Sequence, residues 1–250
     1  MKKRTASGNQ ITEGIIWKQL LLFFFPIVLG TFFQQLYNTA DAIVVGRFVG
    51  KEALAAVGGS TGQIINLVVG FFVGLSSGAT VVIAQFFGAK DEQNLSKSLH
   101  SAIAFSIVGG IVMSILGILL SPAILRLMNT PENVMADSTL YLRVYFGGIL
   151  FVFLYNIGSG ILRAVGDSKR PLYFLIICCF LNIFLDLLLV VVFHMGVAGV
   201  ALGTLISQAV SAVLIIVTLC RSKEMYHLTL REIRFYRAPL LSLLRIGIPA

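Results

Sequence analysis

The sequence predicts an all-α membrane protein, with a bundle of six transmembrane helices followed by the start of a seventh. Hydrophobic residues make up 57% of the chain and charged residues 12%, whereas soluble domains carry about 25% charged residues. The apolar residues gather in runs of about 20 residues or more, which is the length that a helix needs to cross a bilayer. The net charge is +8. The charged residues flank the apolar runs and do not form one basic face, which argues against a nucleic-acid partner.

Polar links, prolines and glycines divide the apolar sequence into six spans. We expect Pro26 to kink the first span. The second is too long for one straight crossing, which predicts a tilt, a bend or a helical extension outside the bilayer. Ser121 and Pro122 indicate the end of the third, and Pro171 begins the fifth, where its missing N–H costs nothing. The six predicted spans cover 15–43, 53–87, 98–120, 138–164, 171–193 and 197–219.

The distribution of basic residues predicts a multi-pass protein with its N-terminus inside. On that assignment the inner segments hold fourteen Lys and Arg residues. The outer segments hold three, which are Arg47, Lys51 and Arg126. This is a strong positive-inside asymmetry.

The end of the chain predicts a three-part organisation. Residues 1–220 form an N-terminal six-helix lobe, 221–238 a basic cytoplasmic linker, and 239–250 the truncated start of a second lobe. Aligning Pro249 with Pro26 places Ile248 on Phe25, and transporters are commonly built from repeated halves. We therefore expect the chain to be a fragment whose second lobe is missing.

Two acidic residues, Asp41 and Asp186, lie in or beside these apolar spans. A carboxylate at the centre of a bilayer costs at least about 2.5 kcal/mol, so such a residue indicates a functional site. The alternative is a structural carboxylate paired with a Lys or Arg. It is disfavoured because neither span offers a cation on the same face within a turn or two.

Polar residues recur at helical spacing on the spans that carry these acids and on two others. Such stripes must face protein or a water-filled cavity, and four of them in one bundle predict a shared polar cavity in the outer half of the membrane. The alternative is hydrogen bonding between helices. The predicted cavity-lining residues are Gln34, Tyr37, Asn38, Asn156 and Gln208, and Asn156 lies deeper than the others.

The predicted cation-coupling residues are Asp41, Asn182, Asp186 and Thr204. Two carboxylates close together in a low-dielectric cavity cannot both ionise cheaply, so one of them could take and release a proton. Alternatively, Asp41, Asn182 and Asp186, together with the hydroxyl of Thr204, could enclose Na⁺. The coupling ion stays open, and no cofactor is expected.

An enzyme is not expected. Residues 58–62 match G-x-S-x-G, but no histidine lies in the middle of a helix to pair with Ser60, and a Ser–His dyad would leave both acids unexplained. The cysteines, Cys178, Cys179 and Cys220, lie in apolar runs without metal-ligand spacing and are expected to act as small hydrophobic residues.

Three segments resemble the multidrug and toxic compound extrusion (MATE) family: residues 53–75, 84–91 and 160–171. The resemblance implies a twelve-helix exporter whose two six-helix lobes face each other in a V, with only the N-terminal lobe present here. It also implies a cation site formed by an acid on the first helix and by an acid and an Asn on the fifth, which Asp41, Asp186 and Asn182 match. Tyr37, Asn156 and Thr204 match residues that line the cavity of prokaryotic relatives.

The function implied by this resemblance is H⁺- or Na⁺-coupled antiport. Organic, often cationic, drugs or toxic metabolites would be exported across the cytoplasmic (inner) membrane of a prokaryote. The implied partners are small organic substrates, the lipid bilayer and the missing lobe. The alternative is a lipid or oligosaccharide-lipid flippase of a related two-lobe fold. It predicts cations lining the cavity, and the spans offer mainly Arg143.

Overall fold

A computed structural model of the chain describes residues 16–247, and they confirm the predicted all-α class. Two of the helices, η1 and η2, are π-helical, and η3 is a single 3₁₀ turn. Pro249, Ile248 and the basic residues 2–4 lie outside the described residues. The helices in chain order are α1 (Ile16–Val44), η1 (Val45–Val49), α2 (Lys51–Gly58), α3 (Ser60–Gly88), α4 (Glu92–Leu127), α5 (Glu132–Ala164), α6 (Lys169–Asp186), η2 (Leu187–Val192), α7 (Gly196–Arg221), η3 (Leu230–Glu232) and α8 (Arg237–Gly247).

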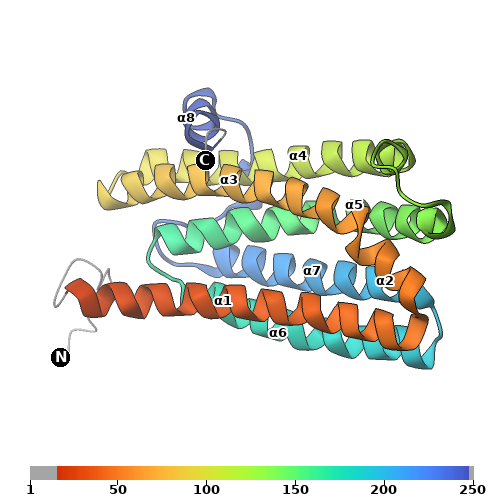
Figure 1. The fold of residues 1–250 in the computed structure, drawn as a ribbon. Helices are drawn as coiled ribbons and strands as arrows, with labels where there is room; N and C mark the ends of the chain where they lie inside the picture. Colours follow the sequence, from red (N-terminus) through yellow and green to blue (C-terminus); the bar gives the residue numbers. More distant parts are fainter. Residues whose placement is uncertain (1–15, 248–250) are drawn as a thin grey trace.

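The long helices lie roughly side by side in a bundle (Figure 1), with α8 crossing over α3 and α4. Among residues 16–247, five helical segments are long and apolar enough to cross a membrane by length and composition: 51–88, 92–127, 132–164, 169–192 and 196–221. The remaining predicted span, which is the first in the chain, is α1, whose 29 residues correspond to about 43 Å. It is continuous through Pro26 and packs along α6.

Helix α5 is the centre of the bundle and packs against α2, α3, α4 and α7. Its residues Leu142, Ile149 and Ile161 are fully buried. Large apolar side chains remain exposed on the outer helices, for example Leu119 on α4 and Phe180 on α6. Such exposure suits lipid, because a bilayer is as apolar as these side chains.

The second predicted span consists of two helices, α2 and α3, and the chain bends between them. Helix α2 ends at Gly58 and α3 begins at Ser60, with Gly59 between them. A Cβ atom on Gly59 would lie 2.6 Å from the Ala55 carbonyl oxygen. The turn therefore needs a glycine, since the side chain of any other residue would overlap the preceding helix.

The predicted end of the third span is wrong, because α4 continues through Pro122 to Leu127. A proline inside a helix removes one backbone hydrogen bond, here the one that the Ile118 carbonyl would accept. Ser121, which is fully buried, donates its hydroxyl to the Gly117 carbonyl. Leu125, one turn beyond, is fully buried, so packing holds the last turn in place.

Several other boundaries also differ from the expected ones. Helix α4 begins six residues before Ser98, where the Asp91 side chain accepts a hydrogen bond from the Asn94 N–H at 3.1 Å. Hydrogen bonds from Asn94 hold the pKa of Asp91 below its ordinary value. Helix α5 likewise begins six residues before Ser138. These first turns are polar, so a hydropathy pattern misses them.

The segment between α7 and α8 is held against the start of α4. The Thr229 N–H donates a hydrogen bond to His100 Nε2 at 3.1 Å, and the Tyr236 N–H donates to Ser101 Oγ at 3.0 Å. Both acceptor side chains are buried. These contacts lead the chain into α8, which packs on α3 and α4.

The backbones of α3 and α8 approach closely at Gly78, so we expect Gly78→Ala to displace α8. A Cβ atom there would lie 2.6 Å from the Gly247 amide nitrogen and 2.7 Å from Gly247 Cα. Backbone atoms cannot rotate away, so the variant should lose about 1–3 kcal/mol of stability. Thermal unfolding of the full-length protein in detergent, with proteolysis of the 222–247 segment, measures both effects.

Gly147→Ala is the control for this test. A Cβ atom on Gly147 meets no atom within 4 Å, so alanine should be neutral or slightly stabilising in the helix. Equal unfolding temperatures and equal proteolysis of the two variants would contradict the close crossing of α3 and α8.

Candidate functional site

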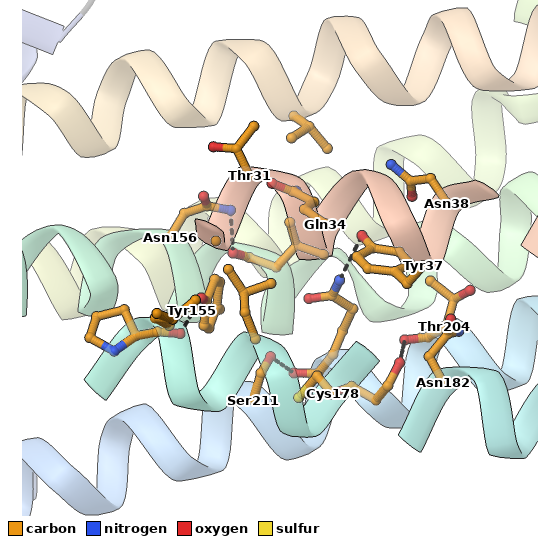
Figure 2. A pocket seen from close by; sticks show the side chains of 18 of the residues that line it. Thr31, Gln34, Tyr37, Asn38, Tyr155, Asn156, Cys178, Asn182, Thr204 and Ser211 are labelled. Carbon is orange, nitrogen blue, oxygen red and sulfur yellow. Dashed lines mark hydrogen bonds between the residues drawn. The ribbon is translucent and has the colours of Figure 1, made fainter. Parts of the chain in front are cut away.

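A polar cavity of about 190 Å³ lies between α1, α3, α5, α6 and α7. Figure 2 shows side chains from several of these helices pointing into it. Pro26 lines the cavity as well, so the proline of the first helix is part of its wall. The structure places all five predicted cavity-lining residues on its surface: Gln34, Tyr37, Asn38, Asn156 and Gln208.

The four predicted cation-coupling residues gather at one end of this cavity. Asp41 is 5% exposed and Asn182 is 1% exposed, and both line the cavity together with Thr204. The Thr204 hydroxyl donates to Asp41 Oδ2 at 3.4 Å. In Figure 2, Asn182 and Thr204 lie next to each other at this end.

Asp186 lies behind this wall. It is 0% exposed and is not one of the lining residues. Its carboxyl group lies against that of Asp41 and against Gly203 on α7. Access to Asp186 from the cavity is therefore expected to pass by Asp41.

Several buried polar atoms of this cluster have no hydrogen-bond partner among residues 16–247. They are Asp41 Oδ1, both carboxyl oxygens of Asp186, and both Oδ1 and Nδ2 of Asn182. A buried polar group without a partner costs about 1–3 kcal/mol. Oxygen atoms of carboxylates, amides and hydroxyls are the ligands that hard cations prefer, so this donor set fits either a proton or a small cation.

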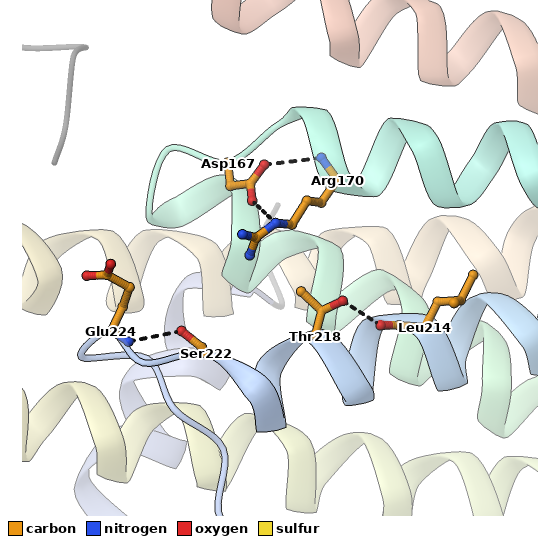
Figure 3. A network of polar contacts seen from close by, with 6 residues as sticks. All are labelled: Asp167, Arg170, Leu214, Thr218, Ser222 and Glu224. Atoms are coloured by element: carbon orange, nitrogen blue, oxygen red, sulfur yellow. Dashed lines mark hydrogen bonds and ion pairs between the residues drawn. The ribbon is translucent and has the colours of Figure 1, made fainter. Parts of the chain in front are cut away.

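The structure does not support the alternative that Asp41 and Asp186 form salt bridges, because no Lys or Arg of residues 16–247 is paired with either acid. In the described part of the chain, the one ion pair within 4 Å joins Arg170 Nε and Asp167 Oδ2, at 3.1 Å. Figure 3 shows this pair where the α5–α6 loop meets the start of α6. It belongs to the loop and leaves Asp41 and Asp186 without a positive partner.

Regular helical spacing positions the cluster, and irregular helix follows each acid. On α1, Asp41 lies one turn after Tyr37; on α6, Asn182 lies one turn before Asp186. The α-helical pattern changes to a π-helix after Val44 in η1 and directly after Asp186 in η2, and these two segments contact each other. Short π-helical segments frequently occur at functional sites.

The middle of the cavity carries amide and hydroxyl groups. Gln208 Nε2 donates to the Tyr37 hydroxyl at 3.4 Å. Asn156 Nδ2 donates to the Val152 carbonyl at 2.8 Å. This bond to the preceding turn of α5 fixes the orientation of the Asn156 amide. These neutral groups can donate to and accept from a polar organic molecule without selecting its charge.

The sequence reasoning missed several lining residues on α5. Tyr141, Tyr145 and Tyr155 line the cavity, as does Arg163. Together with Asn156 they fall close to one helical face, a signal that the spacing contained. Arg143, the cation that the flippase alternative pointed to, is exposed and does not line the cavity.

Membrane-length helices around a polar cavity with buried carboxyl groups define one lobe of a helical membrane transporter. The sequence model of the MatE family matches residues 26–188. The chain belongs to this family, which confirms the resemblance seen in its motifs.

Two curated relatives and one solved structure illustrate the relationship. The probable multidrug resistance protein YoeA of Bacillus subtilis (strain 168) is 34% identical over 242 residues, which cover 94% of this chain and 52% of YoeA. The multidrug export protein MepA of Staphylococcus aureus (strain COL) is 27% identical over 239 residues, covering 94% and 52%. A MOP superfamily transporter from Pyrococcus furiosus matches with a TM-score of 0.89 and 29% identity, over 99% of this chain and 54% of that chain.

The chain thus spans about half the length of the curated relatives it matches. That extent corresponds to one lobe of a two-lobe transporter. The family is a transporter family.

Proposed function

We propose that the full-length protein containing this chain exports organic compounds, including drugs, in exchange for H⁺ or Na⁺. The single observation that carries the proposal is the cluster of unpaired carboxyl and amide atoms at one end of the cavity. The names of YoeA and MepA, a probable multidrug resistance protein and a multidrug export protein, support the same substrate class.

The geometry suggests how ion and substrate would exclude each other. Asp41 faces the cavity and also touches the Asp186 carboxyl group. A proton or Na⁺ held by Asp41, Asp186 and Asn182 would neutralise negative charge at the cavity wall. A cationic substrate would then lose its electrostatic attraction to the wall. Such a reciprocal loss of affinity is the coupling that antiport requires.

Pro26 offers a route from ion binding to movement. It lies in the cavity wall on the same helix as Asp41, and its missing N–H weakens the helix locally. We propose that a change of charge at Asp41 alters the bend of α1 and thereby the shape of the cavity. In the cell we place the protein in the cytoplasmic membrane of a prokaryote, with the N-terminus inside.

A flippase is a weaker candidate. Arg163 is the one Lys or Arg among the described residues that line the cavity. A lipid head group carrying one or more phosphates would be expected to meet several cations.

The test of the proposal is transport by the full-length protein in proteoliposomes. We expect ethidium, an organic cation, to move against its gradient when a proton or sodium gradient of the right direction is imposed. Collapse of the effective gradient with an ionophore should stop the movement. Ethidium transport that is equal with and without gradients, or absent under both, would refute cation-coupled export.

A further inference from the structure

We propose that the end of the cavity opposite the acidic cluster is a subsite for an anionic group, with Arg163 as its cation. The ligand class is an amphiphile that carries a carboxylate or a phosphate monoanion. This inference rests on the proposed export function and specifies which substrates the cavity accepts. It adds a second charged position to a cavity whose other end carries the acidic cluster.

Arg163 is a partly buried cation whose charge is not neutralised by the described residues. It lines the cavity in the last turn of α5, and no acid among residues 16–247 lies within 4 Å of it. The nearest acid along the chain is Asp167, which forms an ion pair with the Arg170 side chain. Asp167 also accepts a hydrogen bond from the Arg170 N–H at 3.1 Å. A guanidinium in this position favours an anion from outside the lobe.

The surroundings of Arg163 form a polar end wall. Ser168 is 5% exposed, lines the cavity, and does not use its hydroxyl to cap α6, although it occupies the N-cap position. The Tyr155 hydroxyl donates to the Pro171 carbonyl at 3.1 Å and so fixes the ring in the same wall. A hydroxyl donor and a guanidinium that line the same cavity match the acceptor atoms of a carboxylate or phosphate.

The two charged ends of the cavity lie far enough apart to bind opposite ends of one molecule. Pro171 lines the Arg163 end and Asn182 lines the Asp41 end, both on α6. Asn182 lies eleven positions after Pro171, which corresponds to about 16 Å along the helix axis. A drug-sized zwitterion can place its cation towards Asp41 and its anion towards Arg163 across the neutral amides.

Two dyes that differ by one esterified carboxyl group provide the test. Rhodamine 110 carries a free carboxylate, and rhodamine 123 is its methyl ester. Their Kd values for the full-length protein in detergent are measured by fluorescence anisotropy, without any ion gradient. We expect Arg163→Gln to raise the Kd of rhodamine 110 by about tenfold or more, the size of one lost charge-assisted hydrogen bond. The Kd of rhodamine 123 should change by less than about twofold.

Two further variants separate a local contact from a general charge effect. Arg163→Lys keeps the positive charge and should retain most of the preference for rhodamine 110. Lys169→Gln removes a neighbouring exposed charge that does not line the cavity, so it should leave both Kd values unchanged. Equal weakening of both dyes by Arg163→Gln, or no weakening of either, would overturn the anion subsite.

Dye binding and gradient-driven transport, measured separately, distinguish this inference from the export proposal. Competition by lipids in the binding experiment identifies the source of the anion. If Arg163 discriminates between the dyes but no gradient drives transport, the subsite stands and the proposed coupling falls. Displacement of rhodamine 110 by short-chain phosphatidylglycerol, but not by phosphatidylcholine, would assign the site to lipid head groups. No displacement by either lipid, with the Arg163 effect retained, would assign it to water-soluble anions.

Discussion

Asp41→Asn and Asp186→Asn are each expected to abolish gradient-driven export by the full-length protein while leaving membrane insertion intact. The substitution keeps the size of the side chain but removes the charge that we propose binds the proton or Na⁺. Both carboxyl groups are buried and lack a cationic partner in residues 16–247. Neutralising an unpaired charge in an apolar surrounding should therefore leave the thermal stability unchanged or raise it.

Efflux of ethidium from proteoliposomes, under proton and sodium gradients separately, measures this effect. Asp167→Asn is the control, because it also removes a carboxylate but affects only the loop pair with Arg170. Asn182→Ala should weaken coupling less, since it removes a ligand and not a charge. Wild-type rates in both Asp→Asn variants would show that the cation-site assignment is wrong. A loss of thermal stability would instead point to a structural role for the carboxylates.

Gly203→Ala is expected to reduce coupled export about tenfold or more, although it replaces no titratable residue. A Cβ atom on Gly203 would overlap Asp186 Oδ1, whereas the next nearest atoms, Asp186 N and Leu185 Cβ, lie at 3.5 Å. The carboxyl group must therefore move, and it is the group that lies against Asp41. The stability cost should be modest, because alanine favours the helix more than glycine and offsets part of the strain.

The readouts for Gly203→Ala are efflux in proteoliposomes and thermal unfolding in detergent. Gly147→Ala controls for the general effect of replacing a glycine within a helix, because a side chain there meets no atom within 4 Å. Export by Gly203→Ala at the wild-type rate would mean that the position of the Asp186 carboxyl group does not matter for coupling.

Hydropathy and helical spacing predicted most of the fold and the composition of the site. A run of apolar residues of membrane length has few alternatives to a helix, because the bilayer leaves no other way to satisfy the backbone. The same reasoning places Gln34, Tyr37, Asn38 and Asp41 on one helical face. The structure puts all four on the cavity wall.

Helix boundaries were less predictable from the sequence. Pro122 indicated an end that does not occur, because the buried Ser121 and Leu125 pack the last turns of α4 into the bundle. The long second span allowed a tilt, a bend or an extension. The choice between them depends on the fit of Gly59 against the Ala55 carbonyl. Both outcomes depend on contacts between neighbouring turns, which a hydropathy profile does not contain.

The sequence by itself determined that this chain is a bundle of membrane helices with acids on polar faces, since length, hydropathy and periodicity are properties of each helix alone. Only the tertiary structure decided which polar groups meet. It placed Asp186 behind Asp41 and against Gly203, and it put Arg163 rather than Arg143 in the cavity wall. The reason is that helical spacing defines a face, whereas the rotation and depth of each helix are set by packing against its neighbours.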